Sequence, residues 1–366
     1  MKVCVTGATG FLGAHVAAQL AARGDEVRVT VRDSRRLEAL AGLDVEVVAA
    51  DVLDRRSMRR ALDGIEMLFH TAGMVASRPR RQVWRVNAVG PRIAVETAAA
   101  CGVRRVVVTS SVASIGPATG DRPVTERNPY PEGGTGLLYT DSKFEGERGA
   151  LSAGERLGTE VVSVCPSYVL GPALNRQRPG ETSTRIVANY LRGRLPAIVD
   201  AYTNIVDVED VAAGHLLAGA RGRPGERYIL GGENLPWSDV IERIARISGV
   251  RYPVLVLPPE IAGVADALKR AGVPFGLLEG IRLMAPNWRY SSARARRELG
   301  YRPRRINETL ERTVRWYQEL IEDDRLGAVT SRSFDRMSAG VRAADRLGLL
   351  LPLRAAGQLA GRRTVL

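Results

Sequence analysis

The chain opens with VCVTGATGFLG at residues 3–13, a short apolar run that leads into three glycines spaced GxxGxxG. The run up to Thr6 is rich in β-branched residues, as expected of a buried parallel strand. Gly7, Gly10 and Gly13 suit a tight turn, close backbone approach to a ligand, and close packing of the next helix on the strand. That helix, expected at residues 11–23, would direct its first N–H groups at an anion. The stretch therefore predicts a dinucleotide-binding strand–turn–helix unit.

Strands and helices alternate over the first half of the chain. Strand-like runs recur at residues 27–31, 45–49, 67–71, 106–110 and 161–165, and helical stretches lie between most of them. This alternation predicts an α/β fold with a doubly wound parallel sheet, which binds ligands at the carboxyl ends of its strands.

The second half of the chain is less regular. We expect a dinucleotide-binding domain over residues 1–165 and a smaller C-terminal substrate-binding lobe over residues 166–322, which is richer in Pro, Gly and Arg. A strand leading into a helix at residues 204–222 is expected to return to the large sheet. The sequence also predicts a short strand at 228–232 and a helix at 236–248.

Composition excludes several classes of protein. The 366 residues carry a net charge of +13, but only three of the 53 basic residues are lysines, and the arginines are scattered and not interleaved with aromatic residues. We therefore expect no nucleic-acid partner. Three isolated cysteines indicate a reducing compartment, and three histidines without ligand spacing predict no metal site. No apolar run approaches the length of a transmembrane helix.

A phenol and an ammonium stand four residues apart at Tyr139 and Lys143, on one face of a predicted helix. A nearby ammonium is expected to lower the pKa of the tyrosine toward neutrality. The tyrosine would then exchange a proton with a carbonyl or alcohol while hydride moves to or from a nicotinamide. Ser110 and Ser111 follow a predicted strand and offer a hydroxyl to the reacting oxygen, although helix capping or turn formation would also explain them.

Taken together, these motifs resemble an extended short-chain dehydrogenase/reductase of the NAD-dependent epimerase/dehydratase family. Within it, the chain is most similar to the dihydroflavonol 4-reductase-like branch, which includes hopanoid-associated sugar epimerase-like proteins. The resemblance covers about residues 1–318. Its landmarks, in chain order, are the glycine turn, Asp51-Val52, Phe69–Gly73, Asn87, Thr109–Val112, Tyr139 with Lys143, Pro166–Pro172, Asn204–Ala212 and Gly225–Gly232.

The resemblance implies a role for each matching residue. Tyr139 would be the acid/base, Lys143 its electrostatic partner and a ribose ligand, and Ser111 the catalytic hydroxyl, because it directly precedes a small residue, here Val112. Asn87 would support a water relay or pack a helix. The implied cofactor-binding residues are Gly7, Gly10, Phe11, Leu12 and Gly13 at the pyrophosphate, Asp51 and Val52 at the adenine, Ala72 and Gly73 over the cofactor, and Pro166 and Val169 at the nicotinamide.

Three departures from the family's patterns narrow the reaction. Val112-Ala113 stands where 4,6-dehydratases carry an Asp-Glu pair, Tyr202–Asn204 stands where many nucleotide-sugar epimerases place an arginine, and Gly116 replaces the asparagine of plant dihydroflavonol reductases. The leading interpretation is an NADP(H)-dependent oxidoreductase that acts on a ketone or secondary alcohol of a lipophilic or polycyclic small molecule. The alternatives are an NAD-retaining sugar epimerase and a non-catalytic dinucleotide-binding protein.

The end of the second predicted strand bears on cofactor choice. NAD-binding proteins usually place an acid there, to accept a hydrogen bond from the ribose. Here Arg32 takes that place, with Arg35 and Arg36 close behind, and a guanidinium suits a 2′-phosphate. The sequence thus favours NADP, while the neighbouring Asp33 keeps NAD as an alternative.

The tail over residues 323–366 lies outside the resemblance. It is basic and amphipathic, with a predicted helix that ends near Pro352. Packing on its own domain or on a partner in a homodimer is the favoured interpretation, and peripheral contact with an anionic membrane is the alternative. We expect a cytoplasmic protein. If the tail contacts a membrane, we expect it to attach to the inner membrane face.

Overall fold

The computed structural model describes residues 1–33, 37–76, 78–174, 183–270, 276–326, 332–359 and 361–366. A large sheet of parallel strands organises the first half, in the order β10-β6-β5-β4-β1-β2-β3. Its strands are β1 Lys2–Thr6, β2 Glu26–Val31, β3 Glu46–Ala49, β4 Met67–His70, β5 Arg105–Thr109, β6 Glu160–Pro166 and β10 Arg227–Leu230. The predicted α/β fold with a doubly wound parallel sheet is confirmed.

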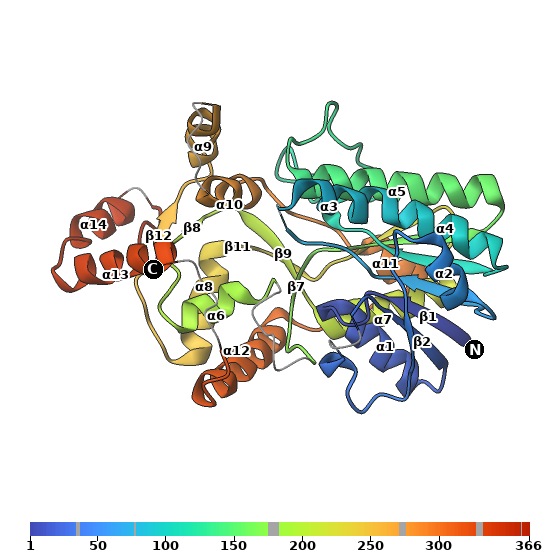
Figure 1. Ribbon diagram of the computed structural model, residues 1–366. Helices are drawn as coiled ribbons and strands as arrows, with labels where there is room; N and C mark the ends of the chain where they lie inside the picture. The colour runs from blue at the N-terminus through green and yellow to red at the C-terminus, as the bar shows by residue number, and fades with distance from the viewer. Residues whose placement is uncertain (34–36, 77, 175–182, 271–275, 327–331, 360) are drawn as a thin grey trace.

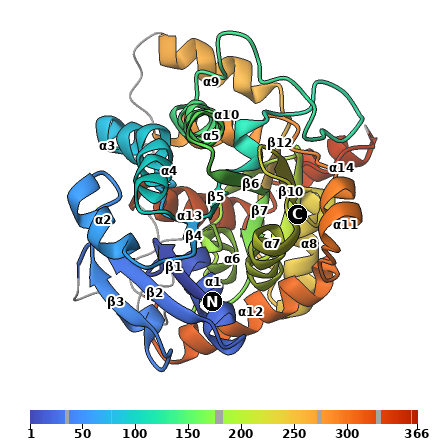
Figure 2. The same ribbon diagram turned by 90° about the vertical axis from the view of Figure 1, so that its right-hand side faces the viewer.

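Helices cover both faces of this sheet (Figure 2). One face packs against α2, α4 and α5, whose buried Met58, Ala94 and Ala150 join one apolar core with the strands. The other face packs against α1, α7 and α11 in a second core. The helices here are α1 Phe11–Ala22, α2 Arg55–Leu62, α3 Arg80–Trp84, α4 Gly90–Ala100, α5 Leu138–Leu157, α7 Val208–Arg221 and α11 Ala293–Leu299, with short turns at Glu38–Leu40, Arg85–Val89 and Val112–Ser114.

A smaller lobe stands at the carboxyl ends of these strands (Figure 1). It holds a three-stranded sheet, β11-β9-β7, and a two-stranded sheet, β12-β8. A third core lies between α6, α8 and α12, around Trp237, Ile241 and Tyr317. The lobe comprises β7 Tyr168–Leu170, α6 Arg185–Leu191, β8 Ala197–Val199, β9 Tyr202–Asp207, β11 Glu233–Pro236, α8 Trp237–Ser248, β12 Leu255–Leu257, α9 Ile261–Arg270, α10 Gly276–Met284 and α12 Ile306–Glu322.

One sequence expectation about the sheet is wrong. The strand expected from residue 204 forms as β9, but it pairs with β7 and β11 in the small sheet. The chain returns to the large domain one element later, through α7 and then β10, whose register with β6 pairs Ile229 with Cys165. A strand and helix in sequence are compatible with either sheet, so their order alone did not decide between them.

The tail forms two helices, α13 Arg332–Arg346 and α14 Leu351–Leu359, at the end of the molecule farthest from the N-terminus (Figure 1). Pro352 lies in the first turn of α14, where its missing N–H is not needed. The last residues return to the substrate lobe: Val256 N donates to Thr364 O at 2.9 Å and Leu366 N donates to Val254 O at 3.0 Å. The tail therefore packs on its own lobe.

Candidate active site

The glycine turn joins β1 to α1 and requires residues without a Cβ. Gly7 has φ +71°, and a Cβ there would lie 2.7 Å from Ala72 Cα. A Cβ on Gly13 would lie 2.3 Å from Gly7 O. Among the described residues no side chain caps α1, which begins at Phe11 after Gly10. The uncapped first turn and the bare backbone fit the phosphates of a dinucleotide.

Three predicted side chains lie where β5 ends beside α5. The hydroxyl of Ser111 lies close enough to the phenol of Tyr139 to lower its pKa. Lys143, one turn further along α5, is buried and donates from Nζ to Thr109 O at 2.8 Å. Ser110 points elsewhere, because its hydroxyl donates to Ser114 Oγ at 2.9 Å. Of the two candidate serines, Ser111 is therefore the one beside the phenol.

Burial dominates the electrostatics of this group. It raises the pKa of Tyr139 above its usual value, and the interaction with Ser111 only partly offsets the rise. The pKa of Lys143 is lowered to about 8, also by burial. The expectation that the ammonium brings the pKa of Tyr139 toward neutrality is wrong for the protein chain by itself, because burial raises that pKa and the group that lowers it is Ser111, not Lys143.

Asn87 fastens the loop after β4 to the catalytic helix. It lies in the π-helical turn Arg85–Val89; its Oδ1 accepts from Met74 N at 2.8 Å, and its Nδ2 donates to Met74 O at 2.9 Å and to Ser142 Oγ at 3.3 Å. A Cβ on Gly73 would lie 3.5 Å from both Asn87 Oδ1 and Lys143 Nζ. The amide thus holds the loop at Met74 against α5, and these three hydrogen bonds belong to helix and loop packing.

A buried carboxylate, which sequence reasoning missed, lies behind the serines. Glu147, one turn after Lys143, accepts from Ser114 Oγ and from Ser163 Oγ, each at 2.6 Å, and its Oε2 lies 3.5 Å from Arg227 Nη1. The network connects α5 with β6, β10 and the turn after Ser111. A signal was present, because the four-residue spacing from Lys143 places Glu147 on the same helix face.

The remaining predicted residues lie along the carboxyl edge of the large sheet or just beyond it. Ala72 packs against the glycine turn, and Val52 is buried near Gly90. Asp51 Oδ1 accepts from Leu53 N at 2.9 Å, so this carboxylate shapes its own turn. Pro166 ends β6, and Val169 pairs with Val206 in the small sheet.

The second strand also ends at this edge. Arg32 directly follows β2 and is exposed, and Asp33 is partly buried. Arg35 and Arg36 lie outside the described residues. The structure thus leaves the Arg32 guanidinium in solvent at the strand end where the sequence placed it.

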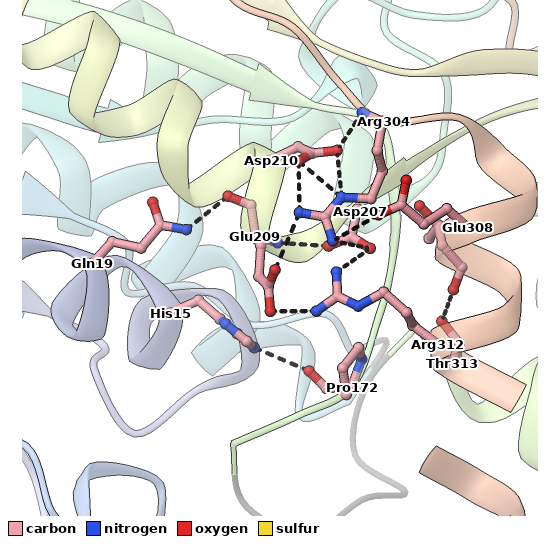
Figure 3. Close-up of polar contacts among 11 residues, drawn as sticks. His15, Gln19, Pro172, Asp207, Glu209, Asp210, Arg304, Glu308, Arg312 and Thr313 are labelled. Atoms are coloured by element: carbon pink, nitrogen blue, oxygen red, sulfur yellow. Dashed lines mark hydrogen bonds and ion pairs between the residues drawn. The ribbon is translucent and has the colours of Figure 1, made fainter. Parts of the chain in front are cut away.

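An ion-pair network seats the substrate lobe beside α1 (Figure 3). Arg304 and Arg312 both contact the buried Asp207, at 3.5 and 3.1 Å, and Arg312 also contacts Glu209. Arg304 further pairs with Asp210 at 3.0 Å. Burial raises the pKa of Asp207 to about 6, while Arg304 opposes the rise. At neutral pH the carboxylate is ionised, and its charge holds the start of α12 to the start of α7.

Two contacts link α1 itself to this network and to the lobe. His15 Nε2 donates to Pro172 O at 3.0 Å, and Gln19 Nε2 donates to Glu209 O at 2.9 Å (Figure 3). The helix that begins at the glycine turn is therefore fixed to the lobe that would hold a substrate.

The fold and these motifs define a dinucleotide-binding enzyme scaffold with a Ser/Tyr/Lys group. A profile of the NAD dependent epimerase/dehydratase family matches residues 3–231, and the chain belongs to that family. It is 36% identical to the sterol demethylase protein B of Methylococcus capsulatus, over 87% of this chain and 99% of the relative, and 33% identical to a putative dihydroflavonol 4-reductase of Synechocystis, over 86% and 94%. The solved structure of a nucleoside-diphosphate-sugar epimerase from Pseudomonas aeruginosa is similar, with a TM-score of 0.74 and 25% identity over 89% of this chain and 99% of that one.

Two kinds of feature are absent from the described part of the chain. No helix in it is long and apolar enough to cross a membrane. No group of three or more His, Cys, Asp or Glu side chains in it is placed to hold a metal ion.

Proposed function

We propose that this protein is an NADP(H)-dependent oxidoreductase that reduces a ketone, or oxidises a secondary alcohol, on a lipophilic or polycyclic small molecule. The observation that carries the proposal is the neighbouring Ser111 and Tyr139 pair, with Lys143 one turn away, at the carboxyl edge that also holds the glycine turn. The names of the two relatives, a sterol demethylase component and a dihydroflavonol reductase, support a polycyclic substrate.

In the proposed reaction, a bound nicotinamide supplies or accepts the hydride. Tyr139 gives a proton to the carbonyl oxygen, or takes it from the alcohol, and Ser111 donates a hydrogen bond to the same oxygen. Because burial raises the pKa of Tyr139, the phenol keeps its proton at neutral pH, as a proton donor in ketone reduction must. The Lys143 ammonium stabilises the phenolate that forms when the proton leaves.

The cofactor would lie along the carboxyl edge of the sheet. Gly7, Gly10, Phe11, Leu12 and Gly13 would hold the pyrophosphate with backbone N–H groups. Asp51 and Val52 would flank the adenine, Ala72 and Gly73 would lie against the cofactor, Lys143 would bind a ribose hydroxyl, and Pro166 and Val169 would border the nicotinamide.

Substitution of Tyr139 tests the mechanism. With NADPH and a series of cyclic ketones ranging from one ring to four-ring sterol ketones, Tyr139→Phe should lower kcat by at least about 100-fold while cofactor affinity stays near that of the wild type. The matched control is Tyr130→Phe, which removes a nearby hydroxyl that donates to Asp141 at 2.6 Å and should leave kcat within about twofold. Wild-type turnover in Tyr139→Phe would refute the mechanism.

Substitution of Arg32 tests cofactor choice. Arg32→Ala should raise the KM for NADPH about tenfold and leave the KM for NADH unchanged, since the guanidinium would pair with the 2′-phosphate. The control is Arg104→Ala, which changes an exposed arginine just before β5, at the amino end of that strand and so away from the carboxyl edge of the sheet. Equal use of NADH and NADPH by the wild type would contradict the NADP assignment. A protein that retains bound NAD through turnover and interconverts sugar nucleotides would establish the epimerase alternative instead.

A further inference from the structure

The link between α13 and α14, with α14 itself, carries five exposed leucines. We call residues 347–359 the leucine elbow. The exposed fractions are 74% for Leu347, 63% for Leu349, 61% for Leu351, 48% for Leu353 and 92% for Leu359. In contrast, Leu350 in the same segment is 6% exposed and anchors the elbow to the protein. Such a concentration of exposed apolar side chains marks a contact surface.

The elbow protrudes and has no single flat face. It lies at the extremity of the molecule, beyond the substrate lobe (Figure 1). Leu351 and Leu353 are two residues apart on α14, about 200° around a helix, so they point to nearly opposite sides. A flat protein surface could bury one side only, whereas a fluid apolar phase can surround the helix.

The charge around the elbow is positive. Residues 332–366 carry seven arginines against two aspartates. Both aspartates already have arginine partners, since Asp335 lies 3.5 Å from Arg194 and Asp345 lies 2.7 Å from Arg354. Arg336, Arg346 and Arg362 are exposed. Two copies meeting elbow to elbow would bring these like charges together, whereas an anionic surface would neutralise them.

We propose that the leucine elbow is a peripheral membrane anchor, which inserts its leucines past the headgroups into the acyl-chain boundary of an anionic bilayer while the neighbouring arginines contact lipid phosphates. Apolar side chains on a short helix with adjacent basic residues bind in this way without spanning the bilayer. The anchor is separate from the candidate active site and does not depend on the proposed reaction.

Vesicle co-sedimentation of the full chain tests the anchor. Binding to vesicles of phosphatidylglycerol and phosphatidylcholine should be strong at 50 mM salt, and should fall at least tenfold at 500 mM salt or with phosphatidylcholine alone. Arg346→Gln with Arg362→Gln should weaken binding about 25-fold, near fivefold for each charge.

The leucines are tested separately. Leu349→Ser with Leu351→Ser should weaken binding at least tenfold. The matched control is Val264→Ser with Leu268→Ser, which changes two exposed apolar residues of α9 and should bind like the wild type. Melting temperatures of all variants exclude loss of folding as the cause.

A fluorescent probe locates the contact. Leu359→Trp places an indole at the most exposed of the five leucines, where folding does not depend on it. Its emission, after subtraction of the wild-type signal, should shift to the blue and be quenched by brominated lipids only when anionic vesicles are present. Absence of vesicle binding by the wild type at 50 mM salt would overturn the proposal. So would an unshifted Leu359→Trp emission, or a dimer in sedimentation velocity that the Leu349→Ser, Leu351→Ser variant dissociates.

Discussion

The close contact between α5 and the π-helical turn Arg85–Val89 can be tested by adding one methyl group to α5. A Cβ on Gly146 would lie 1.9 Å from Asn87 O and 3.2 Å from Pro91 Cγ. Gly149, three residues later on the same helix, is a matched control, because its Cβ would lie 3.6 Å from Arg92 Cβ, an ordinary van der Waals distance. Both substitutions to alanine gain the same helix propensity, so their difference isolates the close approach.

The magnitudes follow from this geometry. Gly149→Ala should raise the free energy of unfolding by up to about 1 kcal/mol, the helix-propensity difference between the two residues. Gly146→Ala must separate α5 from the turn by more than about 1 Å, and overpacking of this kind costs about 1–3 kcal/mol. The separation also breaks the bond from Asn87 to Ser142, worth about 1 kcal/mol. The expected net loss is about 2 kcal/mol.

Thermal unfolding of the wild type and both variants, followed by circular dichroism, measures the difference. Gly146→Ala should melt below the wild type and Gly149→Ala at or above it. Because Lys143 precedes Gly146 by three residues on this helix, kcat should also fall in Gly146→Ala and remain unchanged in Gly149→Ala. Equal melting temperatures for the two variants would refute the reasoning that the α5 contact has no room for a methyl group.

Two further predictions concern stability. Burial lowers the pKa of His215 to about 4, so below pH 6.5 the unfolded chain binds a proton that the folded chain does not bind. The contribution of His215 to stability is therefore complete above pH 6.5 and is lost as the pH falls. In urea titrations, the loss of stability between pH 8 and pH 5 should be smaller in His215→Gln than in the wild type by about 2 kcal/mol. Arg304→Met should lower the free energy of unfolding by about 3 kcal/mol, because it leaves the buried Asp207 carboxylate with less positive charge beside it. Arg302→Met changes an exposed neighbour and should alter the free energy of unfolding by less than about 0.5 kcal/mol. Equal effects of the two substitutions would contradict the role of the ion-pair network in holding the lobe in place.

The sequence predicted those features whose cause is local. A β-branched run before the glycines indicated β1, and the spacing of Gly7, Gly10 and Gly13 indicated the turn. Each of these glycines is required by a close contact within a few residues or with the end of the adjacent strand. The spacing of Tyr139 and Lys143 likewise follows from helix geometry alone.

What sequence reasoning missed depends on partners distant in the chain. In the sequence, Glu147 looks like any carboxylate on a helix surface, because only the complete fold brings Ser163 and Arg227 into contact with it. The partner sheet of β9 depends on β7 and β11, from segments on either side of it in the chain. The pKa of Tyr139 depends on how much water the completed fold excludes, and a spacing carries no information about that.

Burial and mutual repulsion decide which of the basic side chains near the candidate site carries a positive charge at pH 7. His70 and His215 lie close enough to Lys143 to feel its charge, and burial together with that charge lowers their pKa values to about 3 and about 4. Both rings are therefore neutral at pH 7. Lys143, whose pKa is about 8, is mainly protonated there, and Glu147 one turn away favours its charge. Positive charge at this point of the site is thus held on the ammonium, where it can stabilise a phenolate at Tyr139 without competition from the imidazoles.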